Sequence, residues 1–213
     1  MRTTLLLSAA LATAGCTLNL QLQPQLPPPN PGPRVPMKVA LIVPSATREL
    51  TQTTLLPTGC FGLTINPAPQ GEIFAQTVQG VLAQAFDQVV AISGLPAPAD
   101  ADLIVQATLS SIGVKPACLA SPAFYGEAVG SLSTLDSDGR ETWRSARTSA
   151  RAEEGLPMGP SEYQTIMPKA MTNLASAWAS ELAIYVAARR PARVHSAENP
   201  AASAPGSAPW WQK

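Results

Sequence analysis

Runs of apolar residues separated by polar turns predict the first half of a folded domain. Residues 37–44, MKVALIVP, are apolar, rich in branched side chains and closed by a proline, which is typical of a strand buried on both faces. Residues 60–65 predict a second short strand. From Glu72 to Phe86, apolar residues recur at spacings of three and four, which predicts an amphipathic helix with one buried face. Its apolar positions are Phe74, Val78, Val81, Leu82 and Ala85.

Three or four strands are predicted to follow this helix. Residues 88–92 form a short apolar run, and residues 102–112 alternate between apolar and polar side chains, as a half-buried strand of an antiparallel sheet does. Residues 127–135 and 141–150 predict a hairpin. Its turn is Asp136-Ser137-Asp138-Gly139, in which glycine allows the positive φ that such turns need.

A long apolar stripe predicts a second helix at the end of the domain. Ser161 and Gln164 have the spacing of a capping box, and Pro168 either starts the helix proper or kinks its first turn. The stripe comprises Met171, Leu174, Trp178, Leu182 and Tyr185. The order of elements predicts an α+β fold, in which two helices pack on one face of a mixed, mainly antiparallel sheet of about five to six strands. We expect one such domain over residues 37–190.

Proline-rich segments flank this domain. Residues 16–36 predict an extended tether of polyproline type, which would hold the domain away from a membrane. Within it, Leu18, Leu20 and Leu22 alternate with polar residues, which is also the pattern of an edge strand or of a segment that lies along a partner. Residues 191–213 are dominated by Ala, Pro and Ser, a composition that predicts disorder.

Two adjacent tryptophans, Trp210 and Trp211, lie near the end of this tail. Aromatic pairs of this kind occur in short docking motifs and as anchors at membrane interfaces. A docking tail is therefore one interpretation, and a tail without a role is the other.

The first sixteen residues, MRTTLLLSAALATAGC, have the features of an export signal. A basic start precedes an apolar run from Leu5 to Ala14 that is too short to span a bilayer comfortably. The sequence Thr13-Ala14-Gly15-Cys16 resembles the lipobox of bacterial lipoproteins, although the family prefers leucine where Thr13 stands. The resemblance implies that residues 1–15 are a signal peptide and that Cys16 carries a lipid, with palmitate among its acyl chains. An ordinary secretory peptide cut after Ala14 is the alternative.

The residue after the cysteine bears on the membrane to which the lipid would attach. Thr17 stands where an Asp would, by the enterobacterial sorting rule, favour the inner membrane. We therefore expect an outer-membrane lipoprotein that faces the periplasm. No run of eighteen apolar residues follows Cys16, so the lipid is expected to be the anchor.

Two cysteines, Cys60 and Cys118, remain once Cys16 is assigned to lipidation. In an oxidising compartment a disulfide is the default fate of two thiols that come close. We expect a disulfide bond between them, with two separately buried thiols as the alternative. A cysteine nucleophile has little support, because His195 is the single histidine and lies in the tail.

Charge is balanced along the chain, with 14 basic and 14 acidic residues. There is no basic field to attract nucleic acid, so nucleic-acid binding is not expected. The strand predicted over residues 141–150 nevertheless gathers arginines around Trp143. These are Arg140, Arg144 and Arg147. They predict either a face that binds a protein partner or an anionic ligand, or a solvated edge strand whose charges prevent aggregation.

The element order, together with the lipidated and periplasmic setting that the signal implies, resembles small α+β domains of envelope lipoproteins. Similar domains occur in the lipopolysaccharide-assembly lipoprotein LptE and at the amino-terminal end of TolB-like proteins. The resemblance covers Lys38 to Arg190 and depends on layout, because the residues after the cysteine differ from those of the lipopolysaccharide-assembly family. No functional residue is carried over from it.

The sequence lacks the sets of residues that common catalytic mechanisms need. It has no Ser/His/Asp or Cys/His combination, no metal-ligand spacing, and no glycine-rich phosphate loop. We therefore expect neither catalysis, nor a cofactor, nor a metal. The leading hypothesis is an accessory or scaffold subunit of a cell-envelope assembly or transport complex. The alternative is a periplasmic lipid- or glycolipid-binding module with an open cavity between helices and sheet, lined by Phe74, Leu82, Trp178 and Leu182.

Overall fold

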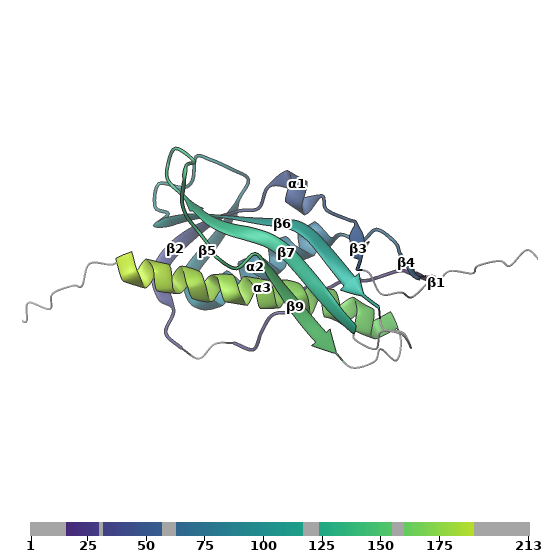
Figure 1. Ribbon diagram of the computed structural model, residues 1–213. Helices are drawn as coiled ribbons and strands as arrows, with labels where there is room; N and C mark the ends of the chain where they lie inside the picture. The colour runs from purple at the N-terminus through teal and green to yellow at the C-terminus, as the bar shows by residue number, and fades with distance from the viewer. Residues whose placement is uncertain (1–15, 30–31, 57–62, 117–123, 155–159, 190–213) are drawn as a thin grey trace, which may run out of the picture.

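A seven-stranded sheet wraps around two long helices in the computed structural model of this chain, which describes residues 16–29, 32–56, 63–116, 124–154 and 160–189 (Figure 1). The strands are β2 (Val35–Ile42), β3 (Thr53–Leu55), β5 (Phe86–Ile92), β6 (Leu103–Lys115), β7 (Phe124–Leu135), β8 (Glu141–Arg144) and β9 (Ser149–Glu154). The helices are α1 (Ser45–Arg48), α2 (Gln70–Ala85) and α3 (Pro160–Arg189). A separate parallel pair is formed by β1 (Cys16–Leu18) and β4 (Leu63–Ile65).

The sheet is mixed, with a parallel and an antiparallel half. Its order is β5-β2-β6-β7-β8, while β3 lies beside β6 and β9 beside β7. The strands β2 and β5, β2 and β6, and β3 and β6 pair in parallel, whereas β7 pairs antiparallel with β6, β8 and β9. The predicted continuous apolar run lies in β2, the inner strand of the parallel half, and Val39 and Leu41 are almost completely buried.

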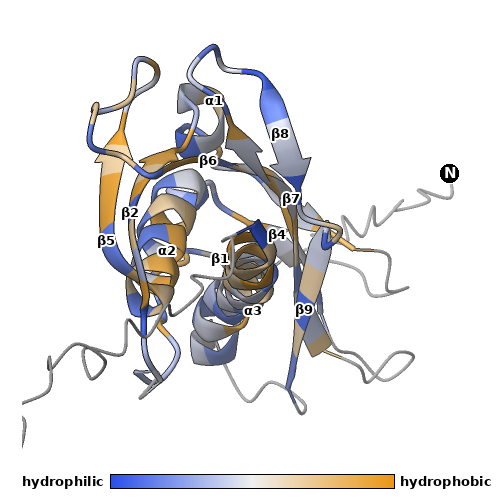
Figure 2. Ribbon diagram, turned by 90° about the vertical axis from the view of Figure 1, so that its left-hand side faces the viewer, coloured by the Kyte–Doolittle hydropathy of each residue, from blue (hydrophilic) through white to orange (hydrophobic). Residues whose placement is uncertain are grey.

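The helices α2 and α3 cover the concave face of this sheet (Figure 2). The apolar stripe of α3 enters the core, where Met171, Leu174, Trp178 and Leu182 are all fully buried. The predicted α+β class, with two helices on one face of a mixed sheet, is therefore confirmed. α3 begins at Pro160 and continues through Pro168, so the helix does not start at that proline, which was one of the two interpretations of the sequence. The proline is buried inside the helix, so tertiary packing offsets the hydrogen bond that its missing N–H loses.

The strand predicted over residues 141–150 is divided into β8 and β9. Glu181 of α3 accepts hydrogen bonds from the Ser145 hydroxyl at 2.5 Å and from the Ala146 backbone N–H at 3.0 Å. Trp178 donates its indole N–H to the Arg147 carbonyl at 2.7 Å. These contacts bind residues 145–147 to α3, while the Ser145 N–H still donates to the Leu132 carbonyl and the Thr148 carbonyl still accepts from the Gly130 N–H of β7. The sheet has seven strands because the predicted strand is divided into β8 and β9 and because β3, which the sequence did not predict, is added.

The segment before β2 packs along the two helices, and we call residues 19–29 the N-terminal strap. Leu20 and Leu22 are buried in the main core cluster, while Gln21 and Gln23 between and after them are exposed. The sequence favoured a free spacer here and kept a segment lying along a partner as its alternative. An edge strand was the other alternative, and in the structure the two leucines are buried in the core of the domain itself.

Candidate functional site

An aromatic cluster lies where β8 meets the C-terminal end of α3. The Trp143 ring stacks on the Tyr185 ring, with centroids 4.9 Å apart and an angle of 26° between the planes. The Arg189 guanidinium lies 4.4 Å from the Tyr185 ring centroid, within the range of a cation–π contact. Trp143 and Tyr185 are half-buried. The sequence assigned Tyr185 to the apolar stripe of the helix, and it packs partly buried against the core cluster, where it also stacks on the predicted Trp143.

Two of the three predicted arginines are neutralised by carboxylates close by in the chain. Arg140 lies 3.1 Å from Asp138, and Arg144 binds Glu141 through Nη2 at 2.6 Å and through Nε at 3.0 Å to both oxygens. The hydrogen bond from Arg144 lowers the pKa of Glu141 and raises that of Arg144 in return. This balanced charge suits a protein partner better than an anionic ligand.

Arg147 occupies a different environment from the other two arginines. It is exposed, and among the described residues its guanidinium makes no ion pair with a carboxylate. It lines a shallow hollow of about 310 Å³ together with Ala146, Thr148, Ser149 and Glu181. The Glu181 carboxylate is already used by Ser145 and Ala146, so its geometry is fixed. Arg147 therefore remains available for a contact outside the domain.

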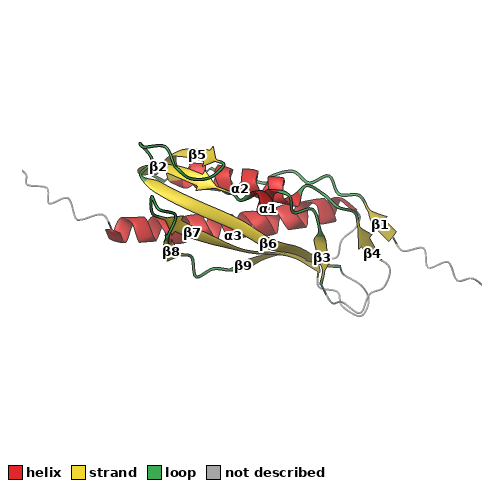
Figure 3. Ribbon diagram, turned by 90° about the horizontal axis from the view of Figure 1, so that it is seen from above, coloured by secondary structure: helices red, strands yellow, loops and turns green. Residues whose placement is uncertain are grey.

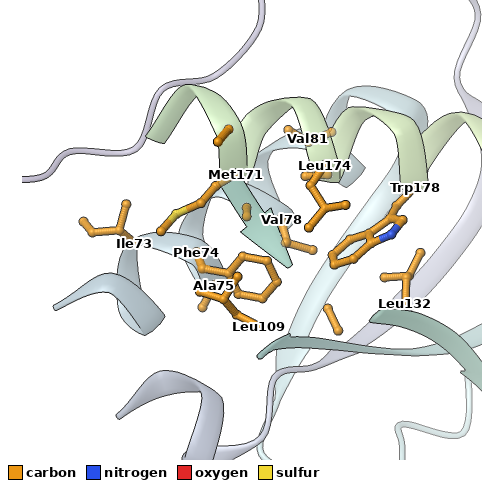
Figure 4. Close-up of a cluster of buried hydrophobic side chains, with 14 of the residues drawn as sticks. Ile73, Phe74, Ala75, Val78, Val81, Leu109, Leu132, Met171, Leu174 and Trp178 are labelled. Carbon is orange, nitrogen blue, oxygen red and sulfur yellow. The ribbon is translucent and has the colours of Figure 1, made fainter. Parts of the chain in front are cut away.

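The space between helices and sheet is filled by side chains. Phe74, Leu82, Trp178 and Leu182, which would line an open lipid-binding cavity, are each at most 1% exposed. Figure 4 shows the indole of Trp178 beside the ring of Phe74, and the two rings meet edge to face with centroids 6.0 Å apart. No apolar slot exists at this position in the described part of the chain.

A hollow of about 290 Å³ lies elsewhere, on the outer side of the helices. Its lining comes from the N-terminal segment and from the facing sides of α2 and α3, and includes Pro27, Val35, Val81, Ala179 and Ala183. It is thus a groove between the N-terminal segment, the start of β2 and the helices, and it differs in place from the predicted cavity between helices and sheet.

The two edges of the sheet differ in charge. β5 forms one edge with Asp87 as its single charged residue. The opposite edge, formed by β8 and β9, carries Glu141, Arg144, Arg151, Glu153 and Glu154. Charged and interrupted edges of this kind prevent unspecific strand pairing. The edge-protection interpretation of the arginines is therefore compatible with their ion pairs.

The remaining predicted site residues are placed only in part. Cys16 is the first residue of β1 and pairs with Leu63 of β4. Cys60, Cys118, Trp210 and Trp211 lie outside the described residues, so the disulfide and the docking tail stay predictions. Within the described ranges, no group of three or more His, Cys, Asp or Glu residues could hold a metal ion, and no helix is long and apolar enough to cross a membrane.

No protein-family model matches the chain, and no curated protein matches its sequence. Among solved structures it is similar to a Xanthomonas campestris protein of a domain-of-unknown-function family, with a TM-score of 0.53, 11% identity, and coverage of 81% of this chain and 97% of that one. An inferred lipoprotein from Caulobacter crescentus gives a TM-score of 0.43 at 14% identity, covering 69% of this chain and 97% of that one.

An uncharacterised lipoprotein B from Nitrosomonas europaea gives a TM-score of 0.42 at 10% identity, covering 73% of this chain and 88% of that one. The TM-score of the first match shows a common fold, whereas those of the two lipoproteins are too low to support an inference. The resemblance to lipopolysaccharide-assembly and TolB-like proteins stays a prediction. The chain therefore shares its α+β fold with a solved bacterial protein of the domain-of-unknown-function family.

Proposed function

We propose that the chain is a non-catalytic lipoprotein of the outer membrane, held at the periplasmic face by a lipid on Cys16. It acts as an accessory or scaffold subunit of a cell-envelope assembly or transport complex. The observation that carries the proposal is the filled core, because Phe74 and Trp178 pack edge to face where a ligand-binding cavity would have to open. Binding is thereby left to the outer surfaces of the domain.

The surface that we assign to the partner is the aromatic cluster with its neighbouring arginines. Trp, Tyr and Arg are the residue types that contribute most to protein–protein binding energy. Here Trp143 is half-buried and already fixed by stacking on Tyr185, so little side-chain entropy is lost on binding. Arg147 adds an exposed charge without an ion pair in the described chain, while Arg140 and Arg144 present balanced pairs at the rim.

The anchor is tested first, by the intact mass of the chain purified from native membranes with and without reduction. A chain that begins at Cys16 and carries acyl mass supports the anchor, and a gain of about two hydrogens on reduction supports the Cys60–Cys118 bond. An unmodified chain cut after Ala14 would overturn the lipoprotein proposal.

The partner surface is tested by crosslinking in the same membranes. A photoreactive side chain at Arg147 should give one dominant protein adduct, and Trp143→Ala should reduce its yield by roughly 30-fold, since a hot-spot residue contributes about 2 kcal/mol or more. Ile184→Ala is the matched control, because Ile184 is 70% exposed on α3. An adduct that survives Trp143→Ala, or one that forms only from a probe at Val90 on the β5 edge, would contradict this surface.

A further inference from the structure

The N-terminal strap is attached to the helices by side chains and by its backbone. Leu20 and Leu22 insert into the core cluster. Thr172 of α3 donates its hydroxyl to the Gln25 carbonyl, and Gln84 of α2 donates its amide to the Pro27 carbonyl at 3.1 Å. Both helices therefore hold the strap along its length.

Leu26 of the strap lies over Gly80 of α2. A Cβ at Gly80 would lie 2.5 Å from one of the methyl carbons of Leu26. The absence of a side chain at this position lets the strap lie directly on the helix. A glycine inside a helix lowers its stability relative to alanine, and Gly80 offsets this cost through its packing role.

The strap leads back to Cys16 without an intervening free segment. β1 begins at Cys16 itself and pairs in parallel with β4, in the register Cys16↔Leu63 to Leu18↔Ile65. The next residue, Asn19, accepts a hydrogen bond from the amide of Asn66. The residue expected to carry the lipid is therefore the first residue of a paired strand.

The β1–β4 pair lies at one end of the molecule. Figures 1 and 3 both place it at the end where α3 begins, away from the C-terminal end of α3, and Figure 3 shows β8 at that other end. α3 has 30 residues, which corresponds to a length of about 45 Å. The aromatic cluster at its far end is therefore remote from Cys16.

We infer that a lipid on Cys16 holds the β1–β4 end of the domain directly against the bilayer surface, without a spacer, and leaves the aromatic cluster at the end remote from the attachment point. This inference depends on the proposed lipid anchor. It differs from a free tether, because about 18 unattached residues would separate the domain from the membrane by roughly 25 Å on average as a flexible coil, and by more in the extended polyproline form that the sequence predicts. The strap thereby limits the partner surface to one range of distances from the membrane.

Neutron reflectometry on a supported bilayer of phosphatidylethanolamine and phosphatidylglycerol measures this separation for the full lipidated chain. Mass spectrometry first establishes that Cys16 of the sample is acylated, so a failure of the anchor is recognised separately. We expect protein density to begin at the headgroups, with a water layer of less than about 10 Å, well below the span of a free tether. A water layer of about 25 Å in the native chain would overturn the inference.

A strap variant gives the positive control for a released domain. Leu20→Asp with Leu22→Asp should detach the strap, because two buried positions would become charged, and the water layer should widen toward about 25 Å. Gln21→Asp with Gln23→Asp places the same charges on the exposed side and should leave the layer unchanged. Circular dichroism identifies a variant that has failed to fold. In that case the water layer measured for the native chain alone tests the inference. Equal layers for the two folded variants would also count against it.

Discussion

Removal of one strap side chain should measure how firmly the N-terminal segment belongs to the domain. Leu22 is 7% exposed and is a member of the core cluster, so Leu22→Ala removes buried apolar volume. Full core sites lose about 2–5 kcal/mol on such a truncation, and the lower end applies here because a strap at the surface can settle into the space. We expect a loss of about 2–3 kcal/mol in the free energy of unfolding.

Urea unfolding followed by circular dichroism measures this loss, and the midpoint of thermal unfolding should fall by about 5–10 °C for a domain of this size. Gln21→Ala is the matched control, because Gln21 is the exposed neighbour of Leu22. Its truncation should change the free energy of unfolding by less than about 0.5 kcal/mol. The reasoning would be refuted if Leu22→Ala stayed within about 0.5 kcal/mol of the native chain, because the strap would then behave as a free tether.

Three contacts elsewhere in the fold give further tests. Gly130→Ala in β7 should lower the free energy of unfolding by about 2–3 kcal/mol in urea, since the added Cβ would overlap the backbone carbonyl of Thr108; an unchanged midpoint would contradict this packing. Arg144→Gln should raise the pKa of Glu141 toward its ordinary 4.5 in an NMR titration, because the hydrogen bond from Arg144 lowers this pKa in the native chain. The lowered pKa stabilises the fold above pH 4.5, and this stabilisation is lost as the pH falls through the lowered pKa. Burial raises the pKa of Tyr163 above its ordinary 10.0, so stability should fall as pH rises through the raised value, and thermal unfolding of Tyr163→Phe at about pH 9 and pH 11 should show a smaller alkaline loss than the native chain.

The hairpin shows where sequence patterns stop being sufficient. Its turn residues and its first strand, β7, follow the prediction, because turn chemistry and apolar alternation are local properties of the chain. Its second strand is divided by Glu181 and Trp178 of α3, which lie more than thirty residues away in the sequence. The pattern of residues 141–150 alone cannot predict that contact.

Within the candidate site, the sequence identified Trp143 and the arginines but not their neighbours. Tyr185 has the spacing of a core residue on α3, and its place beside Trp143 depends on where β8 ends against the helix. The charge of Arg144 also follows from the sequence, whereas its ion pair with Glu141 depends on side-chain geometry within the strand.

By itself, the sequence determined the two long helices and the long strands of the sheet, because hydrophobic periodicity is set by the geometry of each element. It also contained the alternation at Leu20 and Leu22, without the identity of the surface they cover. The tertiary structure decided that surface, and it decided that α3 continues through Pro168. Both depend on contacts between residues far apart in the chain, whose free energy of packing exceeds the local preference for an extended or interrupted backbone.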